Sequence, residues 1–453
     1  MKRILYNALI INEGEKYKGY IEIEDDLIKN TGKGEVPSET LDLYASGERE
    51  NLEEKWILPG IIDDQVHFRE PGLTHKADIE SESKAAALGG ITSFMDMPNT
   101  SPRTVTIPDW EDKMRRGKEK SSVNYSFFIG ATNDNIDEIK RIDNRLVPGI
   151  KVFLGASTGN MLVDSEETLD KIFSLPHIIA VHSEEESIIN ANKKRFIEKF
   201  RTEDLPVELH PLIRSREACV VSTEKAMARA KRLGTNLHVF HISTAEESLM
   251  FEPYHYSSET NPQITAEVCV HHLYFTDESY PTLGTKIKWN PAVKSKADRE
   301  ALLNALNEGR IAVIATDHAP HLSEEKKGGA LKAASGGPLI QFSLPVMIEL
   351  VQKEEVTDMT KVVDCMCHNP ATLYKIRNRG FIRKGYYADL CVVDPNRPFT
   401  VSKEIIASKC GWSPFEGHTF PASVEETFVN GRKVVSEGKL TGEKSARALE
   451  FQL

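Results

Sequence analysis

Residues able to bind a metal ion and an anion follow a short apolar run in the segment PGIIDDQVHFREPG, residues 59–72. The apolar residues 57–62 predict a buried strand, and His67 and Arg69 come soon after it. Side chains two residues apart on extended backbone point the same way, so Gln65 and His67 could bind the same metal ion. A guanidinium nearby suits a carboxylate. The segment predicts a metal and anion site, although a buried strand followed by a polar turn fits this segment alone equally well.

Four more residues of this kind stand on or just after other predicted strands: Lys151, His182, His241 and Asp317. Three histidines and an aspartate suit a zinc-like divalent ion. An ammonium cannot bind a metal, but a lysine amine deprotonated in a water-poor site could react with carbon dioxide and become a bridging carbamate. Each residue alone is explained as well by an ion-paired lysine or a hydrogen-bonded core histidine. Their shared position at strand ends favours the metal site.

The segment IAVIATDHAPHLSEEK places Asp317 directly after a buried strand. An aspartate there could bind a metal and accept a proton from the water that the metal activates. His321 could donate to a substrate oxygen or close over the anion. The alternatives are a helix N-cap for Asp317 and surface loop positions for His318 and His321.

Short apolar strands alternate with helix-like segments through the middle of the chain. Helix-like runs such as SESKAAALGG and DREALLNALNEG end in glycine, a common helix stop. The predicted strands are residues 57–62, 92–97, 123–130, 149–153, 178–181, 236–240, 264–270 and 311–315. Eight strands alternating with helices predict an α/β fold, a (β/α)8 TIM barrel with its active site at the carboxyl ends of the strands.

Strand-like segments stand on both sides of this region. Residues 1–56 alternate in polarity, and the segment TFVNGRKVV has an Asn-Gly hairpin signal. We expect residues 1–56 and 379–440 to form one small β-sandwich beside a barrel of residues 57–378. Residues 441–453 are expected to be a C-terminal tail.

Composition limits the classes of function. The chain has 453 residues and a net charge of −11, which argues against a general nucleic-acid or anionic-membrane surface. No apolar stretch reaches the length of a signal peptide core or a membrane span, so we expect a cytoplasmic protein. The six cysteines show no CxxC pairing and are expected to be reduced core residues.

Several motifs together resemble the dihydroorotases of the amidohydrolase superfamily: DDQVHFREPG, MDMPNTSP, GIKVFLGAS, AVHSEEE, FHIST, KWNPAVKS, ATDHAPHLSEEK and GFIRKGYYADLCVVDP. They occur in family order over nearly the whole chain. The resemblance implies reversible cyclisation of N-carbamoyl-L-aspartate to L-dihydroorotate in pyrimidine biosynthesis, on one or two zinc ions. Symmetric dimers are common among such enzymes, so a homodimer is expected.

The resemblance also implies residue roles. His67 corresponds to a ligand of the first (α) metal, Lys151 to the carboxylated bridge, His182 and His241 to ligands of the second (β) metal, and Asp317 to an α ligand and general base. Residues matching those that hold the substrate's carboxylate and ring amide are Arg69, Asn99, Asn290 and His321, with backbone near Ser335 and Gly336. A turn residue for Asn99 and a pre-proline bend for Asn290 are the structural alternatives.

The chain departs from the family where His-x-His is usual, because Gln65 replaces the first histidine. A neutral amide oxygen binds zinc more weakly than imidazole, so the α site should be poorer. Lys294 stands where arginine is common, and the loop EEKKGGALKAASGGP is unusual; it could be a mobile active-site lid or a flexible surface loop.

Two other functions remain open from sequence. A related cyclic amidase, a hydantoinase or allantoinase, would act on substrates without the carboxylate that Arg69 suits. A catalytically silent homologue, serving for instance as a binding partner of aspartate transcarbamoylase, is supported only by Gln65.

Overall fold

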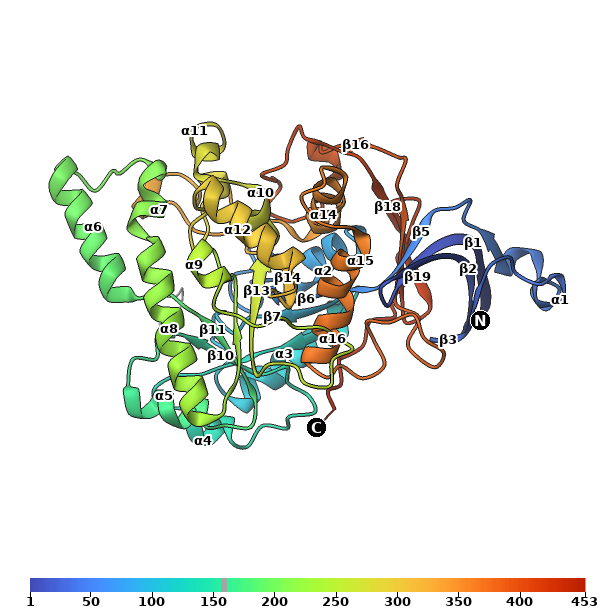
Figure 1. Cartoon of the computed structure of the whole chain (residues 1–453), viewed down its shortest axis with the longest axis horizontal. Helices are drawn as coiled ribbons and strands as arrows, with labels where there is room; N and C mark the ends of the chain where they lie inside the picture. The colour runs from blue at the N-terminus through green and yellow to red at the C-terminus, as the bar shows by residue number, and fades with distance from the viewer. Residues whose placement is uncertain (156–160, 453) are drawn as a thin grey trace.

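A parallel β barrel surrounded by helices forms the larger part of the molecule, and a sheet built from both ends of the chain lies beside it (Figure 1). This computed structural model describes residues 1–155 and 161–452. The last two residues of the predicted GIKVFLGAS motif lie outside the described residues. Within the described residues, no helix is long and apolar enough to cross a membrane.

The barrel consists of two parallel arcs that meet. Its strands are β6 (Ile61–Val66), β7 (Ile91–Asp96), β8 (Asn124–Phe127), β9 (Ile129–Gly130), β10 (Ile150–Phe153), β11 (Ile178–His182), β12 (Asn236–Val239), β13 (Ile264–Cys269) and β14 (Val313–Ala315). Strands β6 to β8 form one arc and β9 to β14 the other, and Val66 bridges His318 where they close. Because β8 and β9 follow each other as one barrel strand, the described part of the chain has the predicted eightfold barrel.

Helices cover the outside of the barrel. They are α2 (Ile79–Leu88), α3 (Ile107–Lys120), α4 (Ile136–Ile139), α5 (Glu166–Phe173), α6 (Glu186–Phe200), α7 (His210–Ile213), α8 (Arg216–Leu233), α9 (Ala245–Ser248), α10 (Val270–Tyr274), α11 (Tyr280–Leu283), α12 (Lys296–Asn307), α13 (Gly329–Lys332), α14 (Ser343–Gln352), α15 (Met359–Val363) and α16 (Asn369–Leu373). Local chemistry sets their ends: the Ser215 hydroxyl accepts from the Ala218 amide at the start of α8, and Gly234 ends it at φ 71°.

The small sheet joins strands from the two ends of the chain. Its strands are β1 (Lys2–Asn12), β2 (Glu15–Glu24), β3 (Leu27–Lys33), β4 (Arg49–Asn51), β5 (Trp56–Pro59), β15 (Leu390–Asp394), β18 (Ser423–Val429), β19 (Arg432–Ser436) and β20 (Lys439–Leu440). Strand β5 pairs with β1 on one side and β15 on the other. The predicted Asn-Gly hairpin is confirmed, because Asn430 and Gly431 turn the chain at φ 48° and 74° between β18 and β19.

The strand predicted at residues 57–62 is wrong, because the chain there forms two strands. Ile57 and Leu58 lie in β5 of the small sheet, and the first barrel strand begins only at Ile61. Gly60 makes the transition: a Cβ on it would lie 2.1 Å from Thr92 Oγ1. The apolar run predicted a single strand because both strands are buried. We therefore propose that the first part of the small domain continues to Pro59, three residues beyond the predicted boundary.

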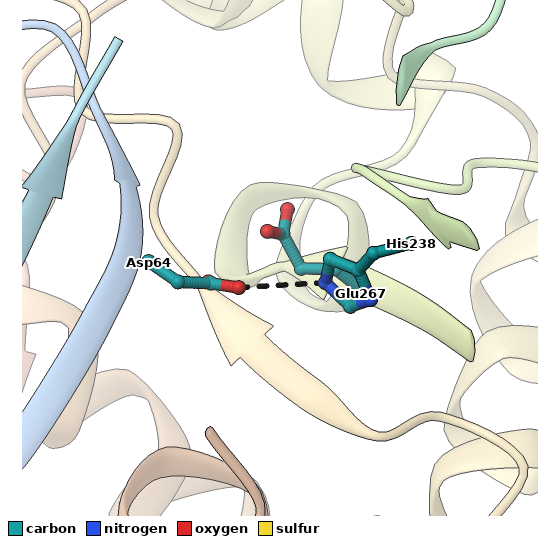
Figure 2. Close-up of side chains that lie close together, drawn as sticks. All are labelled: Asp64, His238 and Glu267. Atoms are coloured by element: carbon teal, nitrogen blue, oxygen red, sulfur yellow. Dashed lines mark ion pairs between the residues drawn. The ribbon is translucent and has the colours of Figure 1, made fainter. Parts of the chain in front are cut away.

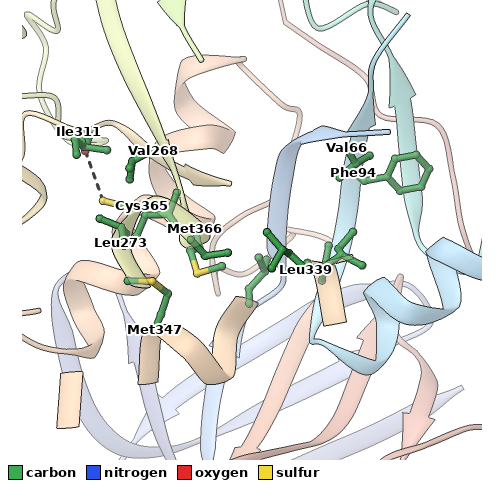
Figure 3. Packing of buried hydrophobic residues seen from close by; sticks show 14 of the residues in the cluster. Val66, Phe94, Val268, Leu273, Ile311, Leu339, Met347, Cys365 and Met366 are labelled. Carbon is green, nitrogen blue, oxygen red and sulfur yellow. Dashed lines mark hydrogen bonds between the residues drawn. The ribbon is translucent and has the colours of Figure 1, made fainter. Parts of the chain in front are cut away.

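Buried apolar side chains fill the space between the barrel and its outer helices (Figure 3). Val66 and Phe94 belong to barrel strands, while Met347 lies on α14. Cys365 is packed here too, with its Sγ 3.7 Å from the Ile311 carbonyl oxygen. All six cysteines are free and buried, as predicted.

The C-terminal residues and the unusual loop after Asp317 are packed against the rest of the chain. Ala448 bridges Tyr125, and Leu449 is fully buried. In the loop, the buried ammonium of Lys326 donates to the carbonyl oxygens of Ala334 and Gly336 at 2.8 and 2.6 Å. These contacts attach the loop to the barrel mouth.

Candidate active site

One cavity at the carboxyl ends of the barrel strands gathers nearly all of the predicted site residues. Its lining is Gln65, His67, Arg69, Asn99, Lys151, Phe153, His182, His241, Trp289, Asn290, Asp317, Ala319, Ser335 and Gly336. Residues from the first and last barrel strands thus lie beside residues from the middle of the chain. His321, the remaining predicted residue, contacts this wall through Arg69 and Ser335.

His67 and Asp317 form one side of the cavity. The His67 Nε2 lies 3.0 Å from Asp317 Oδ1, and its Nδ1 lies 2.8 Å from Asn99 Oδ1. A proton on Nδ1 would be held by the Asn99 oxygen, which leaves the Nε2 lone pair directed at a carboxylate. Two electron-rich atoms facing each other in this way suit a cation between them.

His182 and His241 form the opposite side. The His182 Nδ1 lies 3.0 Å from His241 Nε2. The other His182 nitrogen, Nε2, lies 2.9 Å from Glu184 Oε2, and burial lowers the pKa of both rings. Both imidazoles are therefore neutral near pH 7, the form that binds metals.

Glu184 and Arg214 lie behind His182 and hold its ring in place, and neither was among the site residues predicted from sequence. The Arg214 Nε lies 3.0 Å from each Glu184 oxygen, and Glu184 is fully buried. Although burial opposes ionisation, Arg214 and His182 together hold the pKa of the Glu184 carboxyl well below its usual range. A carboxylate behind a histidine is how proteins commonly orient metal-binding imidazoles. The spacing His-x-Glu in HSEEE was the available signal.

Lys151 lies on β10 with its side chain 1% exposed. Among the described residues, its Nζ has no hydrogen-bond partner, and the Phe240 ring centroid is 4.0 Å away. Burial lowers the pKa of this amine to about 7. A buried ammonium without an acceptor is costly, so the side chain is best satisfied as a neutral amine or as a modified group.

Gln65 is the last but one residue of β6 and faces the same cavity as His67. Its Oε1 lies 3.7 Å from the Cys269 thiol. The amide therefore stands where the family pattern has a histidine, and it offers one neutral oxygen there.

Arg69 and His321 form the end of the cavity that suits an anion. The Arg69 Nη2 lies 3.0 Å from His321 Nε2, and its Nε donates to the Pro320 carbonyl oxygen at 3.1 Å. Burial lowers the pKa of Arg69 to about 10, so its guanidinium remains charged near pH 7. Burial, with Arg69, Lys76 and Lys326 nearby, holds the pKa of His321 far below its ordinary value.

The backbone is strained at three of these residues. Arg69, His241 and Asp317 have φ angles of 68°, 41° and 46°, in the left-handed region that side chains rarely adopt. Such strain persists where surrounding packing imposes it, and it often occurs at functional sites.

The loop residues Ser335 and Gly336 close the cavity wall. The Ser335 carbonyl oxygen lies 3.0 Å from His321 Nε2, and the Gly336 amide donates to the Lys288 carbonyl oxygen at 2.8 Å. Gly336 has φ 123°, and a Cβ there would lie 2.6 Å from the Ala319 carbonyl oxygen. The Ser335 carbonyl and the Gly336 amide already have hydrogen-bond partners. Their role in this structure is therefore to form the cavity wall.

The fold and the site define a class: a (β/α)8 hydrolase barrel with imidazole, amine and carboxylate groups facing one cavity at the strand ends. Residues 56–434 match the Amidohydrolase family, and the chain belongs to this family. A dihydroorotase from Methanosarcina mazei is 33% identical over 80% of this chain and 79% of its own length. A dihydroorotase from Lactobacillus johnsonii is 30% identical over 97% of this chain and 100% of its own.

Solved structures are similar in fold. An L-hydantoinase (dihydropyrimidinase) from Arthrobacter aurescens has a TM-score of 0.91 and 24% identity, with 100% of both chains covered. A dihydropyrimidinase from Brevibacillus agri has a TM-score of 0.87 and 23% identity over 99% of this chain and 98% of its own. At this identity the likeness establishes the barrel and its accessory β domain, and no more.

Proposed function

We propose that the chain is a dihydroorotase, a cyclic amide hydrolase that interconverts N-carbamoyl-L-aspartate and L-dihydroorotate in pyrimidine biosynthesis. The relatives that are 30–34% identical over most of the chain support this assignment. The structural observation that carries it is the buried guanidinium of Arg69 on the cavity wall. It would pair with the substrate carboxylate, which hydantoin and allantoin lack.

The residues at the cavity fit a metal ion. His67 and Asp317 would hold it on one side and His182 and His241 on the other, with Lys151 between them as a carbamate formed by its neutral amine and carbon dioxide. The fit rests on the unpartnered Lys151 nitrogen and on the ring nitrogens that face other electron-rich atoms. A bound zinc ion supplies a Lewis acid that polarises the amide carbonyl and lowers the pKa of water.

The chain's own groups then have separate tasks. Asp317 accepts a proton from the attacking water and returns it to the amide nitrogen, because its carboxylate is the acidic group on the cavity wall. Asn99 and Asn290 would bind the substrate's ring amide, and neutral His321 would donate to its carboxylate beside Arg69. Ser335 and Gly336 limit the size of the ring that the cavity accepts.

The test is side-by-side turnover of L-dihydroorotate, hydantoin and allantoin by the purified, zinc-loaded protein. We expect turnover of L-dihydroorotate, abolished by Asp317→Asn. Activity only on hydantoin or allantoin would replace this proposal by the related cyclic amidase.

The second candidate is a catalytically silent homologue that acts as a binding partner. Gln65 favours it, because an amide in place of a histidine weakens metal binding at the α site. Absence of turnover on all three substrates, together with co-purification with aspartate transcarbamoylase, would support this candidate. A homodimer and a cytoplasmic location remain predictions, and light scattering of the purified protein tests the first.

A further inference from the structure

A second group of metal-type side chains lies inside the barrel, apart from the residues that line the active-site cavity. It consists of Asp64 on β6, His238 on β12 and Glu267 on β13, all fully buried (Figure 2). One potential ligand atom from each lies within 4.8 Å of the others. None of the three was among the site residues predicted from sequence.

Each of these side chains has one polar atom with a partner and one without. Tyr374 donates its hydroxyl to Asp64 Oδ2 at 2.8 Å, and the His241 amide donates to Glu267 Oε1 at 3.1 Å. Within the described residues, Asp64 Oδ1, His238 Nε2 and Glu267 Oε2 have no hydrogen-bond partner. Buried polar atoms are nearly always paired, so three unpaired atoms in one cluster require an explanation.

The proton on His238 can be placed from its surroundings. Its Nδ1 lies 2.7 Å from the Thr265 hydroxyl oxygen, and that hydroxyl lies 3.4 Å from the Leu237 carbonyl oxygen to which it donates. When the hydroxyl donates to that carbonyl oxygen, its own oxygen accepts from Nδ1, and Nδ1 carries the proton. The Nε2 lone pair then faces Asp64 Oδ2, 3.4 Å away. Metal-binding histidines are oriented in the same way, with the second nitrogen donating to a neighbour.

Charge leads to the same conclusion. Asp64 and Glu267 are two fully buried carboxylates with ligand atoms within 4.8 Å of each other, and two such groups cannot both remain ionised without a nearby cation. Either a shared proton or a bound cation must offset this charge.

We propose that Asp64, His238 and Glu267 bind a divalent transition-metal ion such as zinc inside the barrel, distinct from the active-site metal ions. One nitrogen and two carboxylate oxygens are a ligand set that such ions prefer. The ion would join β6, β12 and β13. Because Glu267 also accepts from the His241 amide, the ion would help to hold His241 at its strained φ of 41°.

The experiment counts zinc. The full-length protein is stripped with a chelator, reloaded with Zn²⁺ alone, desalted and analysed for zinc per chain. We expect His238→Gln to bind one zinc fewer than the wild type, and Asp64→Asn to do the same. The matched control is Glu82→Gln, since Glu82 is another fully buried carboxylate paired with a histidine, His318, at 2.8 Å. That substitution should leave the zinc count unchanged.

A complementary variant covers the case in which His238→Gln fails to fold. Lys151→Gln combined with His182→Asn removes active-site ligands only, and we expect it to retain one zinc. Loss of all zinc from that variant, or an unchanged count in folded His238→Gln, would overturn the proposal. So would an infrared band of a protonated carboxylic acid in the zinc-loaded wild type that disappears in Glu267→Gln, because it would show the shared proton instead.

Discussion

Substitution of Glu184 by glutamine tests whether the carboxylate behind His182 orients it for metal binding. The Glu184 Oε2 lies 2.9 Å from His182 Nε2, and Arg214 holds both carboxylate oxygens from the other side. Glutamine keeps the volume but can present an amide NH₂ to the ring, which favours the wrong protonation of His182. We therefore expect Glu184→Gln to weaken zinc binding at the active site.

The size of the effect follows from the geometry. Loss of a group that orients a metal-binding histidine costs about 10- to 100-fold in metal affinity, or about 1.4–2.7 kcal/mol. Breaking a buried ion pair costs about 3–5 kcal/mol of folding free energy, and glutamine, which keeps one acceptor for Arg214, should cost about 3 kcal/mol or less. The protein should therefore remain folded while its zinc affinity falls.

The assay is competition for zinc against a chelator of known affinity, with urea unfolding measured in parallel. Glu185→Gln is the matched control, because the adjacent Glu185 pairs with Ser187 and Lys225 at the surface. Equal zinc affinity in Glu184→Gln and the control, in folded protein, would refute the proposed role of Glu184.

Arg69→Gln should lower kcat/KM for L-dihydroorotate about 10- to 100-fold, because a charge-assisted hydrogen bond contributes about 1.5–3 kcal/mol. An unchanged kcat/KM would contradict the proposal that Arg69 binds the substrate carboxylate. Turnover of hydantoin, which has no carboxylate, is the comparison. Gln65→His should raise zinc occupancy at low zinc concentration, and unchanged content by elemental analysis would contradict the account of a weak α site. Lys151→Ala should lose zinc from the active site, and full retention there would contradict the carbamate. In the zinc-free protein, His272 and His368 should each favour unfolding on acidification, because burial lowers the pKa of both to about 4. Between that value and the unfolded pKa of about 6.5 the unfolded chain binds more protons, so each histidine should remove about 1.4 kcal/mol between pH 7.5 and 5.5. Urea unfolding of the wild type and of His368→Gln at the two pH values measures this contribution, and an equal change in stability in both proteins would refute it.

Local patterns in the sequence were sufficient for the barrel and for most residues at its mouth. Alternating apolar strands and glycine-ended helices predict the repeat, and the parallel repeat brings all strand carboxyl ends to one rim. Residues that follow those strands, such as His67, His182 and Asp317, consequently lie at one cavity although they are far apart in the chain. The same periodicity could not separate β5 from β6, because both are short, apolar and buried.

Only the tertiary structure decided which groups face one another. The pairs His182 with His241, His67 with Asp317 and Arg214 with Glu184 depend on contacts between distant segments. The buried group of Asp64, His238 and Glu267 likewise arises because three strands close into one barrel. Sequence determined which chemical groups stand at the strand ends, because strand order and side-chain alternation are local properties. Barrel closure determined their distances, partners and protonation, because these depend on burial and on neighbours that no local pattern specifies.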